Sequence, residues 1–370
     1  MGKSHKAFQF RIYPTVEQKE LFVKTFGCCR FLYNQMLSDK MEEYKKTAKM
    51  LKTTPAAYKK EFPWLKEVDS LALANVQLHL ERAYRNFFER PESGFPKFKS
   101  KHRSRNAYTT NLVNGNIQLF ENGLKLPKVG VVKAKIHRQI PEGFRMKAVT
   151  VRRQPSGKYY VSILFEYCVD ENQVQDRERR ERKVIGIDYA MHGLAVFSDG
   201  SKCEYPSYYR RSEKRLSRDQ RKLSRCKYGS SNYQKQKKKV ARCHEKVKNQ
   251  RRDFHHKLSR TLAEEYEVVA VEDLNMKAMS QCLNFGKSVA DNGYGMLLNM
   301  LGYKLEERGG KLVKVDRFFP SSKRCSQCGK VKQVLPLSER VYRCECGYTN
   351  DRDVNAAINI REEALRLLSV

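Results

Sequence analysis

Acidic side chains are scarce in this sequence relative to basic ones. Its 370 residues include 41 Asp and Glu against 74 Lys and Arg, which gives a formal net charge of +33 at pH 7. So large an excess of one sign opposes compaction unless a polyanion neutralises it. Nucleic acid fits this requirement, because each phosphate contact releases condensed counterions. The charge therefore favours a nucleic-acid-binding protein over one with a merely solvated basic face.

Long apolar runs are also absent. No stretch is long enough to span a bilayer, so we expect no membrane partner. The first residues, MGKSHKAFQFRIYP, lack the apolar segment of a secretory leader, and Lys6 does not complete a myristoylation pattern. We also expect no small-molecule cofactor.

The eleven cysteines do not suggest a disulfide framework, because their number is odd and the chain reads as cytosolic. Four of them form two knuckles, Cys325-x-x-Cys328-Gly and Cys344-x-Cys346-Gly, with 15 residues between. Four thiolates at this spacing predict one structural Zn²⁺, since they leave no open coordination position. The second knuckle is one residue shorter than usual. The cysteines outside the two knuckles are expected to be buried or incidental: Cys28, Cys29, Cys168, Cys203, Cys226, Cys243 and Cys282.

The periodicity of the first half changes twice. Residues 6–13 alternate as in a strand, and a capping box at Thr15 and Gln18 begins a helical region that continues to residue 89. Residues 107–167 return to a period of two and predict an antiparallel barrel or sandwich. If the first strand pairs with that sheet, residues 15–100 are a helical insertion. The charged segment 171–183 marks a domain boundary.

The second half follows an α/β order of strand, hairpin, helices, strand, helix, strand and helix. Residues 210–260 form a helical pair, broken at 229–232, with 20 Lys and Arg against 4 Asp and Glu. An ordinary solvated helix pair mixes both signs, so this excess favours a nucleic-acid-binding ridge. The basic and aromatic segment 95–105 is expected to follow a phosphate backbone.

Acidic residues stand at the ends of two apolar strands. Asp188 follows VIGI and Glu272 follows VVAV, so parallel pairing would place both carboxylates at one sheet edge. The third acid is Asp351 or Asp353. Asp353 shares a helical stripe with Ala357, Ile360, Ala364 and Leu367 or Leu368, so it should face the sheet, whereas Asp351 should cap the helix. Asp273 should point away from Glu272.

Such a carboxylate trio suits phosphodiester hydrolysis. The reaction uses two metal ions about 4 Å apart, one activating water and one holding the leaving oxygen. Mg²⁺ prefers hard oxygen ligands. Any one of these acids alone is commonly a turn or cap residue, whereas the three together favour a nuclease site.

Several blocks of the chain resemble the TnpB (OrfB-type) proteins of insertion sequences: FRIYPTVEQKELFVKTFGCCRFLYN, GIDYAMHGLAVFSDG, VEDLNMKAM, FFPSSKRCSQCG and CECGYTNDRDVNAAINI. The resemblance implies a bacterial or archaeal, cytoplasmic and nucleoid-associated RNA-guided DNA endonuclease, related to type V CRISPR effectors. Its partners would be a transposon-derived guide RNA and double-stranded target DNA beside a short adjacent motif. It also implies Asp188, Glu272 and Asp353 as the catalytic ligands of two Mg²⁺ ions.

The implied fold is multi-domain α/β, with an RNase H-like (RuvC) nuclease domain carrying an inserted zinc ribbon, preceded by a β-barrel (wedge) with a helical insertion. The expected domains are a wedge barrel at 1–14 and 101–180, a helical recognition insertion at 15–100, a RuvC-like domain at 181–319 and 348–370, and a zinc ribbon at 320–347.

Three residues are candidates for nucleic-acid contacts. Gln77 suits an adenine edge, although a solvated Gln on a helix is an equal alternative. Lys323 and Arg324 adjoin the ribbon and would hold a substrate strand. Two other functions stay open: a transposase or transposition accessory protein, and a cleavage-inactive guided regulator. A simple zinc-ribbon transcription factor would leave the three acids unexplained.

Overall fold

The structure is a computed structural model that describes residues 3–168, 183–191, 193–282, 285–336 and 338–369. The chain forms two compact units, Met1–Val169 and Asp170–Val370. The predicted boundary in 171–183 falls almost entirely outside the described residues. Within the described ranges, no helix combines the length and apolar character needed to cross a bilayer.

The first unit is built on a seven-stranded antiparallel sheet of order β2-β6-β7-β1-β5-β4-β3. Strand β1 (Lys3–Tyr13) pairs with β7 (Tyr159–Cys168) and β5 (Gly130–Lys135). This pairing confirms that the first strand joins the later ones, so the helices between them are an insertion. The other strands are β2 (Ala107–Asn111), β3 (Gln118–Phe120), β4 (Gly123–Leu126) and β6 (Arg145–Arg153).

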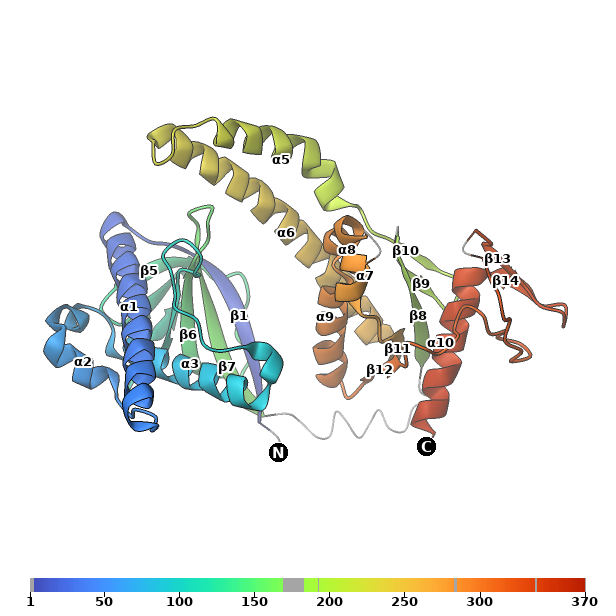
Figure 1. Ribbon diagram of the computed structural model, residues 1–370, viewed down its shortest axis with the longest axis horizontal. Coiled ribbons are helices and arrows are strands. Elements are labelled where there is room, and N and C mark those ends of the chain that lie inside the picture. The colour runs from blue at the N-terminus through green and yellow to red at the C-terminus, as the bar shows by residue number, and fades with distance from the viewer. Residues whose placement is uncertain (1–2, 169–182, 192, 283–284, 337, 370) are drawn as a thin grey trace. The chain divides into compact units, whose positions relative to one another are not determined.

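The predicted barrel is an open half-barrel in the described residues, because the sheet has two edges, β2 and β3. Helices α1 (Val16–Thr47) and α3 (Ser70–Glu89) pack against β2. Figure 1 shows both helices beside the sheet of this unit. Phe22 and Phe26 of α1 contact the ring of Tyr108 on β2. These helices bury the apolar face that barrel closure would otherwise cover.

The helical insertion begins as its sequence predicts. Thr15 caps α1, and its hydroxyl and the side chain of Gln18 form the expected reciprocal capping box. A short helix α2 (Pro55–Glu61) and the 3₁₀ turns Pro63–Glu67 and Pro91–Ser93 complete the insertion. The segment 95–105 then returns to α1, where Asn34 accepts a hydrogen bond from the Lys99 N–H (2.7 Å) and donates to its carbonyl (2.9 Å).

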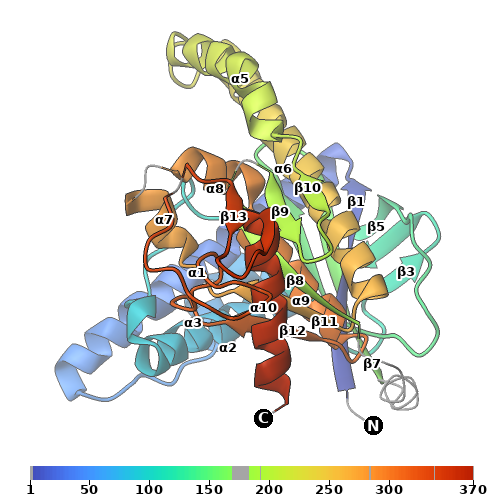
Figure 2. The ribbon, with the colours of Figure 1, turned by 90° about the vertical axis from the view of Figure 1, so that its right-hand side faces the viewer.

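The second unit contains a five-stranded sheet of order β10-β9-β8-β11-β12. Strands β8 (Val184–Ala190), β11 (Val268–Glu272) and β12 (Lys311–Val315) are parallel, whereas β9 (Leu194–Phe197) and β10 (Lys202–Glu204) continue the sheet as antiparallel strands. Figure 2 shows the sheet with α10 beside it. The order of strands and helices agrees with the α/β pattern of the sequence.

Helices cover both faces of this sheet. Val271 of β11 packs with Leu297 of α9 on one face, whereas its neighbour Ala270 packs with Ile360 of α10 on the other. A strand buried on both sides must be apolar at every position, which explains the uninterrupted VVAV run. The helices of this unit are α5 (Tyr208–Ser224), α6 (Ser231–Glu265), α7 (Met276–Cys282), α8 (Gly286–Asn292), α9 (Tyr294–Glu306) and α10 (Arg352–Leu368).

A small ribbon is inserted between β12 and α10. Its strands β13 (Val341–Arg343) and β14 (Thr349–Asp351) pair antiparallel, and Arg324 forms a β-bridge with Val331. This element carries the four cysteines of the two knuckles.

Candidate metal centres

Asp188 and Glu272 lie side by side toward the C-terminal ends of two neighbouring parallel strands of the second sheet. Strands β8 and β11 are parallel neighbours, as the sequence argument required, and Ile187 pairs with Val271 in their register. The next residue on each strand is the acid. Because side chains alternate along a strand, Asp188 lies on the same face as Gly186, the face covered by α10.

A glycine brings α10 to this edge. A Cβ at Gly186 would lie 2.0 Å from the carbonyl oxygen of Ala357 and 2.8 Å from the backbone nitrogen of Arg361. The helix backbone therefore occupies the space that any side chain at Gly186 would need. Asp353 lies one helical turn before Ala357, and Asp188 lies two residues beyond Gly186 on the same face.

The pKa of Asp188 responds to burial and to the two other acids. Burial, then the nearby Glu272 and then Asp353, raise the pKa of Asp188 well above its ordinary value. Burial also raises the pKa of Glu272, although a hydrogen bond from Ser321 opposes this. A nearby carboxylate disfavours the charged form of an acid, whereas a bound cation favours it. The donor set, hard oxygens from separate segments, fits Mg²⁺.

Asp351 and Asp273 take other roles. The Asp351 side chain caps α10 by accepting hydrogen bonds from the N–H groups of Asp353 (2.9 Å) and Val354 (3.3 Å), which confirms its predicted position. It also pairs with Lys202 at 2.7 Å. Asp273 points away from Glu272 and pairs with Lys314 at 2.9 Å.

The predicted helical stripe holds for most of its length. Ala357, Ile360 and Ala364 are buried, as expected for the face that packs on the sheet. Of the two alternatives for the last position of the stripe, Leu367 is 44% exposed and Leu368 is partly buried, so Leu368 fits the stripe better. The apolar cluster that α10 forms with the sheet ends at Ala364, so the last turn of the helix does not pack against that cluster.

Tyr294 is a residue near this edge that the sequence analysis missed. The side chain is 1% exposed and its ring lies 4.6 Å from that of Tyr189 on β8. In the described part of the chain, its hydroxyl has no hydrogen-bond partner. Burial, followed by the charges of Asp188 and Glu272, raises its pKa. An unpartnered buried hydroxyl beside carboxylates agrees with a hydrated cation at this edge.

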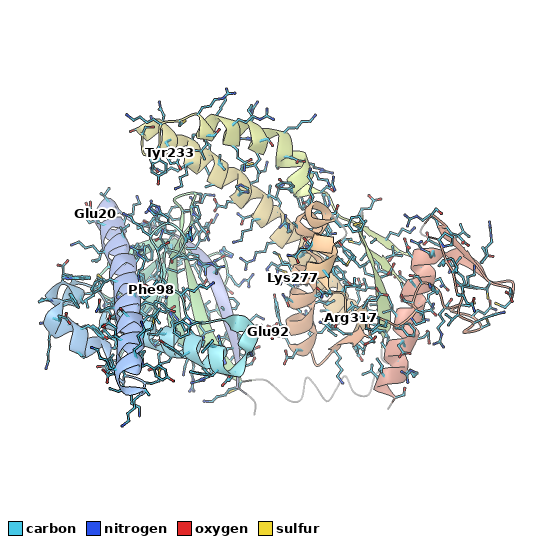
Figure 3. The ribbon with its side chains drawn as sticks, viewed as in Figure 1. Glu20, Glu92, Phe98, Tyr233, Lys277 and Arg317 are labelled. Carbon is cyan, nitrogen blue, oxygen red and sulfur yellow. The ribbon has the colours of Figure 1, made fainter. Side chains whose placement is uncertain are left out.

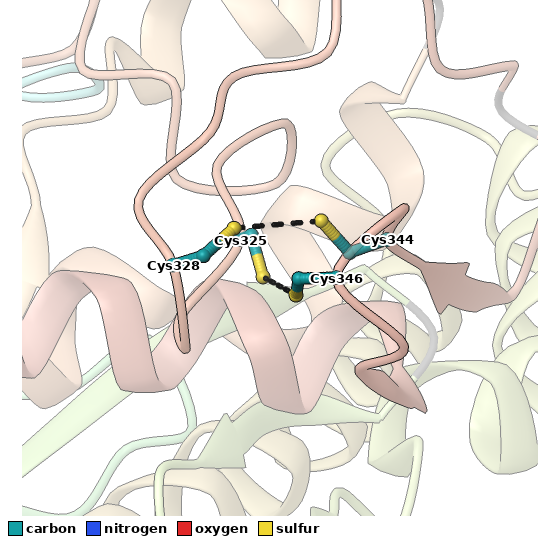
Figure 4. A group of neighbouring side chains, drawn as sticks. All are labelled: Cys325, Cys328, Cys344 and Cys346. Atoms are coloured by element: carbon teal, nitrogen blue, oxygen red, sulfur yellow. Dashed lines mark hydrogen bonds between the residues drawn. The ribbon is translucent and has the colours of Figure 1, made fainter.

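The four cysteines of the ribbon converge. Their sulfur atoms all lie within 4.8 Å of one another, with 3.8 Å between Cys325 and Cys346 and 3.6 Å between Cys328 and Cys344 (Figure 4). A tetrahedral ion with bonds of about 2.3 Å to sulfur separates its ligands by about 3.8 Å. These separations are too long for a disulfide. The quartet is therefore compatible with a structural zinc.

The knuckle turns explain how short segments bring the sulfurs together. Gly329 and Gly347 follow the second cysteine of each knuckle with φ of +77° and +88°, a region that residues with a Cβ rarely adopt. The Gly329 N–H donates to the carbonyl of Cys325, and the Gly347 N–H donates to that of Cys344. The shorter Cys344-x-Cys346 knuckle therefore closes like the longer one.

Family models match three parts of the chain. Residues 166–283 match a model described as a probable transposase (OrfB of the IS605 group), residues 294–360 match a Cas12f1-like TNB domain, and residues 1–49 match a helix-turn-helix domain. In this structure the N-terminal region that matches the helix-turn-helix model forms strand β1 followed by the single 32-residue helix α1, rather than two helices.

Two relatives match nearly the whole chain, and both carry the name "Putative RNA-guided DNA endonuclease". The relative from Streptomyces pristinaespiralis is 35% identical over 97% of this chain and 89% of its own length. The relative InsQ from Escherichia coli strain K12 is 32% identical over 97% of this chain and 92% of its own length. This protein belongs to the TnpB family.

The fold of this TnpB-family chain resembles that of a type V effector. A Cas12f1 chain, solved by electron cryomicroscopy in a complex with single-guide RNA and target DNA, matches with a TM-score of 0.60 at 13% identity. The match covers 97% of this chain and 99% of the other. At this identity the likeness shows a shared fold.

The three candidate nucleic-acid contacts stay predictions, and the structure places each of them. The Gln77 amide donates to Glu81 one turn along α3 (2.8 Å). The Lys323 ammonium donates to the carbonyl of Gln333 within the ribbon (2.9 Å). The Arg324 guanidinium lies 5.9 Å from the ring centroid of Phe319.

Proposed function

We propose that this protein is an RNA-guided DNA endonuclease that cuts double-stranded DNA beside a short adjacent motif. The observation that carries the proposal is the position of Asp188 and Glu272 at the ends of neighbouring parallel strands, with α10, which bears Asp353, held against the sheet at Gly186. The names of relatives that match 97% of the chain support the same activity.

In this proposal one RuvC-like site carries out the hydrolysis. Mg²⁺ at the site would activate a water molecule and stabilise the leaving oxygen. Asp188, Glu272 and Asp353 would hold two such ions, while Asp351 keeps the first turn of α10 in place. The pKa of Asp188, raised by burial and then by the charges of Glu272 and Asp353, supports the binding of a cation there.

The cysteine quartet would hold one structural Zn²⁺. Four sulfur ligands leave no position for water or substrate, so the ion would stabilise the ribbon rather than take part in the chemistry.

A transposon-derived guide RNA and the target DNA would bind along the basic surfaces. The hairpin of α5 and α6 has a large excess of Lys and Arg, which suits a phosphate backbone. Near its tip, the ring of Tyr228 is 75% exposed and lies 5.0 Å from that of Tyr233, which Figure 3 labels. Delegating sequence choice to base pairing lets the protein contact backbone and helical shape.

The test is a cleavage assay with the RNA that copurifies with the protein. That RNA is sequenced, and DNA matching its guide region is offered with Mg²⁺ or with EDTA. We expect double-strand breaks only with Mg²⁺ and only in matched DNA. Cleavage without RNA, or none with matched DNA across a library of flanking sequences, would contradict the proposal.

Strand transfer is the second candidate, because the matching family model at residues 166–283 is described as a probable transposase. Transposases also use carboxylates and divalent ions. Joined donor and target DNA, formed without RNA, would favour this function over guided cleavage.

A further inference from the structure

A single loop connects the carboxylate site to the cysteine quartet. It runs from the end of β12 to Ser326 and contains Ser321, which is 4% exposed. The Ser321 hydroxyl donates a hydrogen bond to Oε1 of Glu272. Among the described residues, the structure records no hydrogen bond to the other oxygen of this carboxylate.

Two buried asparagines of α10 hold this loop. The Asn359 amide donates to the carbonyl of Ser321 (2.8 Å) and to that of Arg324 (2.6 Å). The Asn355 amide donates to the same Arg324 carbonyl (2.8 Å) and accepts from the Ser326 N–H (3.1 Å). Asn355 and Asn359 are 0% and 3% exposed, so each makes these bonds in a dry environment where a lost partner is costly.

The bonds of Asn355 flank the first cysteine ligand on both sides. Arg324 precedes Cys325 and Ser326 follows it, so the backbone at Cys325 is fixed by α10. The first turn of the same helix carries Asp353. One rigid helix therefore holds a carboxylate, the entrance to the knuckle and the carbonyl of the serine that contacts Glu272.

We propose that Ser321 is a positioning residue for Glu272, and that Asn355 and Asn359 couple it to the quartet. Zinc in the quartet fixes the position of Cys325, and the hydrogen bonds of the two asparagines then fix the loop. Ser321 in turn holds Glu272 in the orientation that binds a divalent cation. The inference rests on the proposed metal-dependent function. It adds that filling one metal site raises the affinity of the other.

The first test is Mn²⁺ affinity, measured by electron paramagnetic resonance on the full-length, zinc-loaded protein without nucleic acid. We expect Ser321→Ala to raise the Kd for Mn²⁺ about tenfold or more, as removal of a residue that orients a metal ligand commonly does. Zinc content should stay at one ion per chain. Ser321→Thr, which keeps a hydroxyl, should restore most of the affinity.

Ser322→Ala is the matched control. Ser322 is the neighbouring serine, and within the described residues its hydroxyl has no recorded hydrogen bond, so its loss should leave Mn²⁺ binding unchanged. Equal Mn²⁺ affinity in Ser321→Ala and the unmodified protein would overturn the inference. If Asp188→Asn also leaves Mn²⁺ binding unchanged, the proposed function fails instead, so the two failures are distinguishable.

The second test uses the reciprocity of coupled sites. Protein freed of metal is titrated with Mn²⁺, with and without one equivalent of Zn²⁺. We expect zinc to lower the Kd for Mn²⁺ about fivefold or more in the unmodified protein, and Mn²⁺ to strengthen zinc binding by the same factor. In Ser321→Ala this difference should disappear. Its persistence there, or its absence in the unmodified protein, would contradict the coupling.

Discussion

The carboxylate site and the cysteine quartet are joined by one loop, yet they are assembled in opposite ways. The quartet comes from the 22-residue segment 325–346, and its four sulfurs all lie within 4.8 Å. The acids come from positions 188, 272 and 353, and their oxygens form no such cluster in the described residues. Hydrogen-bonded thiols tolerate crowding, whereas carboxylates repel one another. The cysteine quartet is preformed by local turns, whereas tertiary packing holds the carboxylate site when no cation is bound.

The largest effect should come from removing a carboxylate. Asp188→Ala, Glu272→Ala or Asp353→Ala should each lower cleavage by about 1,000-fold, more than the 10–100-fold typical of residues that only support a metal ligand. RNA binding should persist, because the basic hairpin is untouched. The measurement is cleavage rate together with RNA affinity.

Asp351→Ala is the control for this assignment. Loss of the cap should cost about 0.5–2 kcal/mol of stability while cleavage is retained. If Asp351→Ala abolishes cutting and Asp353→Ala does not, the two acids have been assigned the wrong roles.

Replacing a cysteine of the quartet should lower the stability of the ribbon rather than alter the cleavage chemistry. Cys325→Ser should reduce zinc from one ion per chain to none and speed hydrogen exchange across residues 320–347, because the turns lose the ion that joins them. Cys203→Ser, at a cysteine outside the quartet, should keep its zinc. Folded protein that lacks zinc by elemental analysis would end the zinc proposal.

The dependence of the carboxylate site on packing can be tested with two glycines. Gly186→Ala should cost about 3 kcal/mol or more and reduce cleavage, because its methyl group would meet the α10 backbone. Gly27→Ala, in α1, meets nothing within 4 Å and should stabilise the protein by about 1 kcal/mol. Thermal unfolding of both variants is the measurement, and equal effects would contradict the close approach of α10.

The smallest effect concerns charge alone. The raised pKa of Asp188 means that the folded protein holds this proton at higher pH than the unfolded chain does. Metal-free stability should therefore fall as the pH rises from the ordinary Asp range through the raised pKa. At neutral pH, Asp188→Asn should stabilise the metal-free protein. Destabilisation in thermal melts would show that the carboxylates are not in conflict.

Much of this architecture was predictable because it follows from local patterns. The knuckle spacing identified the quartet, the apolar strands placed Asp188 and Glu272, and the helical stripe with Ala357 and Ile360 indicated that Asp353 rather than Asp351 faces the sheet. The carboxylate assignment itself stays a prediction.

The supporting residues were less visible because they depend on distant partners. Nothing in the sequence near Ser321 indicates that its hydroxyl contacts Glu272. The sequence around Gly186, the glycine of VIGI, does not indicate that a helix backbone packs against it. A signal existed for Asn355 and Asn359, two amides spaced one turn apart on a helix whose neighbouring residues are apolar. The open half-barrel was missed because local periodicity does not reveal where helices replace a closing strand.

The most direct test is a structure of the protein with Mn²⁺, with diffraction collected at the manganese absorption edge. Anomalous peaks bounded by Asp188, Glu272 and Asp353, about 4 Å apart for two ions, are the predicted result. Manganese bound elsewhere, or Asp353 turned away from an occupied site, would contradict the account.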